Sequence, residues 1–136
     1  MKKLFISVPM KGRMEENIRN SIEKMHRIAE AVFGEELEVI DSYIEHKPPQ
    51  NSNEAIWYLG KSLEKLSKAD YFIGIRWSDC FGGCNIESEV AIRYGIKTYL
   101  VELELFPDAV EAAREFWEKE RNTAKESERA LEGVVG

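Results

Sequence analysis

Hydrophobic positions along this chain alternate between two spacings. Short, mostly apolar runs of the kind that form buried strands occupy residues 3–7, 37–41, 71–76 and 97–103. Between these runs, apolar residues recur at steps of three and four, which is the spacing of an amphipathic helix. The pattern predicts helices over residues 15–33, 54–68 and 87–94, and a further one beginning at residue 107 or 108.

Strands that alternate with helices are typical of a parallel sheet with right-handed crossovers and helices on both faces. We therefore predict an α/β fold: a three-layer sandwich of the flavodoxin-like or Rossmann-like kind, with a parallel sheet of four to five strands. A chain of 136 residues is long enough for one domain with its own core, so residues 1–136 are expected to form a single domain. Its last part, residues 107–136, is a strongly charged helical segment.

Composition narrows the functional classes. The net charge is −6, and no run of lysine and arginine marks a site for polymeric nucleic acid. No apolar run is long enough to cross a membrane, and the N-terminal residues lack the apolar region of a signal peptide. The two cysteines, Cys80 and Cys84, have no neighbouring histidine or second pair, which argues against zinc and against a disulfide scaffold. We expect a cytoplasmic protein without a metal or cofactor.

A glycine-bearing stretch follows the third predicted strand and leads into a helix. It contains Gly82 and Gly83, which are predicted to contact a ligand, and then Glu87, which is expected in the first turn of the helix. Ligands of open α/β sheets bind where strands end and helices begin. The helix dipole stabilises a carboxylate at such a position by about 0.3–1 kcal/mol. Glu87 is therefore either a capping acid or a nucleophile kept ionised by the same field.

The loop after the first strand carries groups that suit an anion. Ser7 offers a hydroxyl, Lys11 and Arg13 offer charge, and Gly12 allows a close backbone approach before a helix begins. The alternative is a polar turn with two solvated cations. A phosphate or sugar site and a plain surface turn both remain open at this point.

The second predicted helix adds candidates near the same edge of the sheet. Ser62 borders the buried stripe and either contacts a sugar hydroxyl or bonds a backbone carbonyl one turn earlier. Trp57 and Tyr58, near the start of that helix, either form a stacking wall for a base or belong to the core. Among the apolar positions of this helix, Ile56, Leu59, Leu63 and Leu66 are expected to face the core.

Three stretches of the chain resemble the nucleoside 2-deoxyribosyltransferase superfamily, which includes deoxynucleoside-monophosphate N-glycosidases, and within it the small phage-associated members. The resemblance covers roughly residues 3–103. Residues 5–12 are similar to the family's first strand and sugar- or phosphate-binding loop, and this implies substrate contacts for the loop, Met10 included. Residues 63–70 and the apolar strand after them are similar to its second helix and third strand. Glu87, Ala91 and Gly95 match the spacing around its nucleophile.

The resemblance implies that Glu87 attacks C1′ of a 2′-deoxyribosyl group, displaces the base and forms a covalent sugar ester that passes to another base or to water. It also implies a homo-oligomer. The family's usual glycine and aspartate are replaced by Glu89 and Ser62, and Asp79 is the nearest acid before the nucleophile that could act as proton donor. Two functions follow as expectations: cleavage or exchange of the N-glycosidic bond of deoxynucleosides or their monophosphates, or non-catalytic binding of such a nucleotide.

Overall fold

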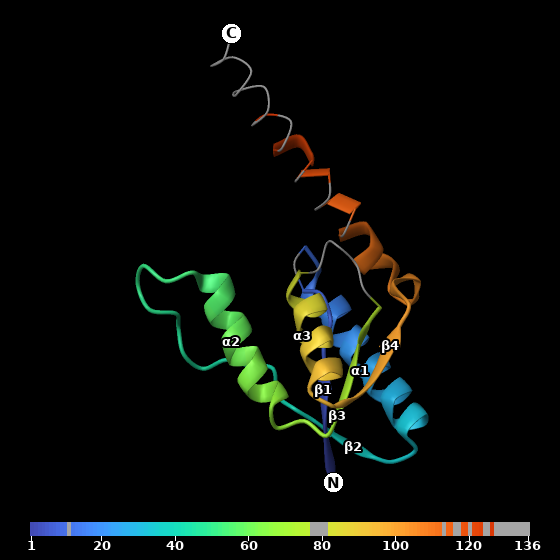
Figure 1. Ribbon diagram of the computed structural model, residues 1–136. Helices are drawn as coiled ribbons and strands as arrows, with labels where there is room; N and C mark the ends of the chain where they lie inside the picture. The colour runs from blue at the N-terminus through green and yellow to red at the C-terminus, as the bar shows by residue number, and fades with distance from the viewer. Residues whose placement is uncertain are drawn as a thin grey trace.

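A computed structural model of the chain describes residues 1–10, 12–76, 82–112, 114–115, 118–119, 121–123 and 126. Within them, four parallel strands form one sheet in the order β2-β1-β3-β4 (Figure 1). The strands are β1 (Lys2–Ile6), β2 (Leu37–Val39), β3 (Tyr71–Ile75) and β4 (Lys97–Val101). The strand order reverses between β1 and β3, so the crevice beyond their carboxyl ends is the expected ligand position of such a sheet. The predicted three-layer α/β sandwich with a parallel sheet is confirmed.

The helices cover both faces of the sheet. Helix α1 (Glu15–Phe33) lies on one face, and α2 (Glu54–Leu66) and α3 (Gly82–Arg93) lie on the other (Figure 1). Neighbouring residues of β1 show the division: Leu4 packs in a cluster with α1, whereas Phe5 packs in a second cluster with residues of α2 and α3. Alternation of side chains along a strand produces this division.

The central strand β3 is buried along its whole length, as expected for a parallel sheet covered on both faces. Ile73 belongs to the α1 cluster, and Phe72 belongs to the α2–α3 cluster, where its ring stacks on Phe5 with centroids 5.7 Å apart. Gly74 faces α3: a Cβ atom at this position would lie 2.7 Å from the Phe72 ring and 3.3 Å from Ser88 Oγ. The missing side chain lets α3 lie close to the sheet.

The structure corrects the predicted start of the third helix, the place of Glu87 within it, and the packing of Ile56. Helix α3 begins at Gly82, so Glu87 is not in its first turn. Each glycine in a helix costs about 1 kcal/mol relative to alanine. Burial of Ser88 and Ala91 against the sheet outweighs this cost. Ile56 is 66% exposed because α2 joins the core through Leu63 and Leu66, near its C-terminus.

The fourth strand is also shorter than predicted. β4 ends at Val101, and a 3-10 turn, η1 (Leu103–Leu105), follows it. Residues 107–112 are helical as predicted, and Phe106 and Ala109 pack into the α1 cluster, so the beginning of the charged C-terminal segment adds to the core. No helix in the described parts of the chain has the length and apolarity needed to cross a membrane.

Candidate functional site

The carboxylate of Glu87 accepts hydrogen bonds from two serines of other elements. Ser7, the residue after β1, donates from Oγ to Oε1 at 3.2 Å. Ser62, in the third turn of α2, donates from Oγ to Oε2 at 2.8 Å. Only 9% of Glu87 is exposed. Both oxygens of a buried carboxylate are therefore held in place from opposite sides.

The sheet positions the first serine. The Ser7 backbone N–H donates to the carbonyl of Ile73 at 2.9 Å, which continues the ladder between β1 and β3 beyond the last residue of β1. Because Gly74 leaves room for α3, Glu87 on that helix reaches the end of β1. The site thus occupies the carboxyl ends of the two central strands.

Burial and hydrogen bonding act on Glu87 in opposite directions. Burial, the larger effect, raises the pKa of the Glu87 carboxyl, because the charged form loses contact with water. The hydrogen bonds from Ser62 and Ser7 favour the charged form and lower the same pKa, and the net direction is upward. This carboxyl is easier to protonate than an exposed glutamate.

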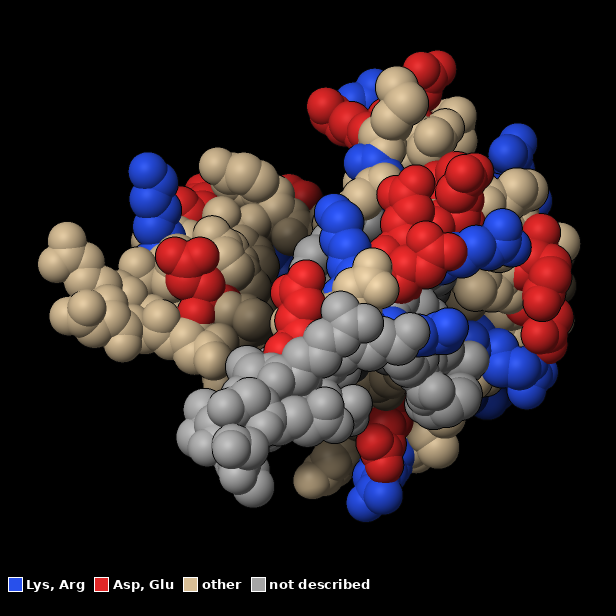
Figure 2. All heavy atoms as spheres, turned by 90° about the horizontal axis from the view of Figure 1, so that it is seen from above, with Lys and Arg blue, Asp and Glu red and all other residues tan. Residues whose placement is uncertain are grey.

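A pocket of about 360 Å³ opens beside this carboxylate. Its polar lining among the described residues consists of Ser7, Ser42, Ser62 and Glu87. The rest of that lining is apolar or aromatic and comes from β1 and the residues after it, from the loop before α2, and from α2 itself. Seen from above, the surface over α2 and the preceding loop carries few charges, whereas acidic and basic side chains are concentrated on the rest of this face (Figure 2). A mostly apolar pocket with a few polar groups is the usual form of a small-molecule site.

Four of the predicted site residues meet in this pocket: Ser7, Met10, Ser62 and Glu87. The backbone bond considered for Ser62 is not formed: its hydroxyl donates to Glu87, a partner that the sequence did not suggest, and a contact with a sugar hydroxyl stays a prediction. Met10 is half exposed at 49% and lines the same space. Residues from three separate segments thus converge on one carboxylate.

Arg13 has a different environment. Its side chain is fully buried and forms an ion pair with Asp108, with Nε 2.6 Å from Oδ2. The guanidinium also donates to the carbonyl of Pro9 and to Ser21 Oγ. Gly12 adopts a positive φ of 77° close to Ala112, and neither Gly12 nor Arg13 appears among the described residues of the pocket wall. Arg13 therefore ties the loop after β1 to α1 and to the C-terminal helical residues.

The remaining candidates lie elsewhere. Trp57 is absent from the described pocket lining; its ring meets the Tyr58 ring edge-on at 5.1 Å, and Lys61 Nζ lies 5.5 Å from its centroid. Gly82 and Gly83 form the start of α3 and not a loop. Lys11 and Asp79 lie outside the described residues, so their predicted roles stay predictions.

Besides the four predicted site residues in this pocket, the described lining includes three residues that bear on the choice of ligand: Tyr58, which the sequence offered beside Trp57 as a stacking group, and Ser42 and Ile44. Tyr58, exposed at 42%, is one of two aromatic residues of the described pocket wall, with Phe5, and it lies four residues before Ser62 on the same face of α2. Helical phase from Ser62 would have selected Tyr58 over Trp57. Ser42 and Ile44 belong to the long loop between β2 and α2. Only the length of this loop could have indicated that it lines a site, since long loops in compact domains are often functional.

Cys84 lies near Ser7, and its thiol stays protonated at neutral pH. Burial raises the pKa of the Cys84 thiol to about 11, which outweighs the opposing hydrogen bond to Ser7. A thiol that keeps its proton at neutral pH is a poor nucleophile. Within the described residues, no group of three or more histidine, cysteine, aspartate or glutamate side chains is arranged to hold a metal ion.

Comparison with known proteins finds no matching family model, no significantly similar curated protein and no significantly similar solved structure. The contacts of Glu87 and the pocket beside it are therefore the features that point to a function. The resemblance to deoxyribosyltransferases stays an expectation that these contacts can support or oppose.

Proposed function

We propose that this protein cleaves or exchanges the N-glycosidic bond of 2′-deoxynucleosides or their monophosphates, with Glu87 as the nucleophile. One observation carries the proposal: the carboxylate of Glu87 is buried at the carboxyl ends of β1 and β3, is held by Ser7 and Ser62, and lines a pocket of about 360 Å³. A fixed nucleophile beside a bound substrate lowers the entropic part of the barrier.

The proposed reaction has two displacements. An oxygen of the Glu87 carboxylate attacks C1′, the C1′–N bond breaks, and the base leaves with the bonding electron pair and takes up a proton. The result is a glycosyl ester on Glu87. In the second step, water or a nitrogen of another base attacks C1′, the ester C–O bond breaks, the carboxylate is restored, and the attacking group loses a proton.

The pocket wall fits the two parts of a nucleoside. Ser42, like the serines that hold Glu87, offers a hydroxyl for the hydroxyl groups of a sugar. Tyr58 and Met10 offer an aromatic ring and a polarisable side chain for the face of a base. Of the two aromatic residues that the sequence offered as a stacking wall, Tyr58 is kept in the proposal and Trp57 is not.

Proton delivery to the leaving base requires an acid beside the pocket. Among the described lining residues, Glu87 is the only carboxylic acid. Asp79 remains the proposed donor from the sequence, and it lies outside the described residues. Substrates whose bases leave readily are therefore expected to react fastest.

Assembly as a homo-oligomer and a cytoplasmic location stay part of the proposal. Light scattering of the purified chain tests whether it forms a homo-oligomer.

A second function is favoured by the hydrogen bonds themselves. Ser7 and Ser62 occupy both oxygens of Glu87, and such bonds reduce the basicity and nucleophilicity of a carboxylate. In a nucleotide-binding protein without turnover, Glu87 would accept a hydrogen bond from a sugar hydroxyl in the same pocket. The pocket is common to both functions, and only turnover separates them.

Product analysis decides between the two functions. The protein is incubated with each deoxynucleoside and each 5′-monophosphate, with and without an acceptor base, and the bases are separated by chromatography. Base release or exchange that disappears in Glu87→Gln supports the proposal. Saturable binding without turnover favours the binding protein, and full activity of Glu87→Gln rules out Glu87 as the nucleophile.

A trapping experiment tests the covalent step directly. A fluorine at C2′ of the sugar withdraws electrons from C1′ and slows both displacements, and an activated leaving group keeps the first one fast enough to occur. Intact mass spectrometry is then expected to show one added fluorodeoxyribosyl group, and peptide mapping is expected to place it on Glu87. A label found only on another residue contradicts the assigned nucleophile.

A further inference from the structure

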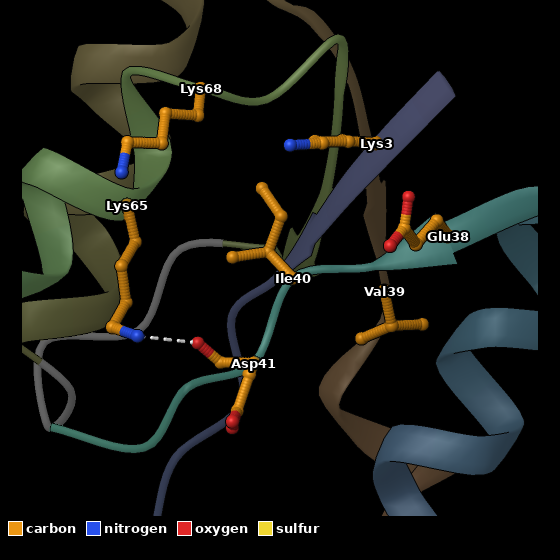
Figure 3. A pocket seen from close by; sticks show the side chains of 7 residues that line it. All are labelled: Lys3, Glu38, Val39, Ile40, Asp41, Lys65 and Lys68. Atoms are coloured by element: carbon orange, nitrogen blue, oxygen red, sulfur yellow. Dashed lines mark hydrogen bonds between the residues drawn. The ribbon is translucent and has the colours of Figure 1, made fainter. Parts of the chain in front are cut away.

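A second pocket, separate from that of Glu87, is lined by three lysines (Figure 3). Its volume is about 310 Å³, and it lies between the β1–β2 side of the sheet and the C-terminal half of α2. Lys3 comes from β1, Lys65 from α2, and Lys68 from the residues just after α2. Ile40 and Val39 provide the apolar part of the wall.

The three lysines approach the pocket from two sides. Lys3 extends from β1 toward α2, and Lys65 extends from α2 toward the end of β2, with Ile40 between them (Figure 3). The Lys65 ammonium is fixed, since Nζ donates to the backbone carbonyl of Asp41 at 2.7 Å. Cationic donors on facing elements create a positive space that no single helix or strand provides.

Two acidic residues, Glu38 and Asp41, line the same pocket, but neither forms an ion pair with these lysines in the described part of the chain. Asp41 gives its carbonyl to Lys65, whereas its carboxylate accepts the backbone N–H of Tyr43 at 2.9 Å. Asp70 accepts the backbone N–H of Lys3 and not its ammonium. The side chain of Glu38 stands on β2, and the Lys3 amine points away from it (Figure 3). Within the described residues, none of the three lysines has an ion-pair partner.

Position on a helix explains only part of this arrangement. Lysines near a helix C-terminus interact favourably with its dipole, which accounts for Lys65 and Lys68. Lys3 is an exposed residue on a strand, and it lines the same pocket without an ion-pair partner among the described residues. Like charges gathered around one pocket are most stable when an anion lies between them.

From this geometry we infer that the pocket of Lys3, Lys65 and Lys68 binds a phosphate-bearing small molecule. Three ammonium groups match a multiply charged phosphoryl group, because lysine acts as a point charge with several donors. The apolar wall at Ile40 leaves room for a non-phosphate part of the ligand. The ligand is either a free inorganic phosphate compound or the phosphate chain of a nucleotide. This binding is independent of the reaction proposed at Glu87.

Calorimetric titration of the full chain at low ionic strength tests the site. The probes are inorganic pyrophosphate and adenosine 5′-triphosphate, each without divalent cations. We expect saturable binding that weakens by about tenfold or more in the double variant Lys3→Gln/Lys68→Gln, since two charge-assisted contacts are lost. Lys97→Gln is the matched control: it removes one exposed lysine at the start of β4, and it should bind as the wild type does.

The outcomes are distinct. Pyrophosphate binding as tight as nucleotide binding identifies a free phosphate compound, and tighter nucleotide binding identifies the phosphate chain of a nucleotide. The proposal is overturned if neither probe saturates, if Lys3→Gln/Lys68→Gln binds like the wild type, or if Lys97→Gln loses as much affinity. Circular dichroism of each variant checks that it is folded. Backbone amide shifts on addition of pyrophosphate should concentrate at residues 3, 39–41 and 65–68, and shifts confined to other residues contradict the site.

Discussion

The hydroxyl of Ser62 donates a 2.8 Å hydrogen bond to Oε2 of Glu87 and thereby connects α2 to α3 beside the pocket. Ser62 and Glu87 are 25 residues apart in the chain. The bond favours the charged form of Glu87, whereas burial favours the neutral form. Ser62 therefore adjusts the protonation of the group that we propose as the nucleophile.

Replacing Ser62 with alanine is expected to move the acidic limb of the pH–rate profile to higher pH. Loss of the hydroxyl removes the interaction that lowers the pKa of Glu87, so a higher pH is needed to ionise the carboxyl. The profile of base release for Ser62→Ala measures this shift. Ser67→Ala is the matched control, because the Ser67 hydroxyl bonds the carbonyl of Glu64 and lies away from the pocket. An unchanged limb in Ser62→Ala contradicts the assigned coupling.

Glu87→Gln is expected to stabilise the fold at neutral pH. Because the pKa of Glu87 is raised above its ordinary value of 4.5, the folded protein holds this proton more tightly than the unfolded chain does. The free energy of unfolding of the wild type therefore falls as pH rises from about 4.5 through the raised pKa. Glutamine does not titrate, so the variant gains relative to the wild type over that interval.

Urea unfolding of both proteins between about pH 4 and about pH 8 checks the direction. The matched control is Glu89→Gln, two residues along the same helix, where the side chain is exposed and paired with Arg93. That change should alter the free energy of unfolding by no more than about 0.5 kcal/mol. A stability difference for Glu87→Gln that shrinks as pH rises would be inconsistent with the raised pKa.

Asp108→Ala is expected to destabilise the protein by about 1–3 kcal/mol, because it leaves the buried guanidinium of Arg13 without its anion. The comparison variant is Glu102→Ala. It breaks the ion pair between Arg76 and Glu102, which has the same 2.6 Å separation but is about 60% exposed on both sides. The exposed pair should contribute less than about 1 kcal/mol. Equal losses in denaturant unfolding would show that burial of Arg13 does not set the cost.

The same ion pair should weaken in acid. Arg13 holds the pKa of the Asp108 carboxyl below its ordinary value of 3.8. Its contribution to stability is therefore complete above pH 3.8 and is lost as pH falls through the lowered pKa. The difference between wild type and Asp108→Ala should shrink only in that acidic range.

Gly74→Ala is expected to destabilise the fold by about 1–3 kcal/mol and to weaken ligand binding at the Glu87 pocket. The added methyl group would lie 2.7 Å from the Phe72 ring and 3.3 Å from Ser88 Oγ, so the Phe72 ring has to shift and α3 has to yield at Ser88. Gly60→Ala is the matched control, because no atom lies within 4 Å of its added Cβ. That change in the interior of α2 should stabilise the protein by about 0.5–1 kcal/mol. Thermal unfolding and titration with a deoxynucleoside measure both effects.

Much of the fold could be predicted from local patterns. The apolar run at β3 and the three- and four-residue steps of α1 correspond to the observed elements because each reports burial of a nearby stretch of chain. The start of α3 could not be predicted in the same way. Gly82 and Gly83 have poor helix propensity, and packing of the following residues on the sheet determines that they are helical.

The same distinction between local pattern and tertiary packing applies to the candidate site. Chain order and periodicity are enough to predict that Glu87 follows the third strand, that Ser7 follows the first, and that both lie at the same edge of a parallel sheet. Tertiary structure alone decided that Ser62 bonds Glu87 and that Tyr58 lines the pocket while Trp57 does not. It also decided that Arg13 is buried against Asp108, 95 residues away. Each of these contacts joins distant segments, and their geometry depends on how closely helices pack on the sheet, which no local pattern encodes.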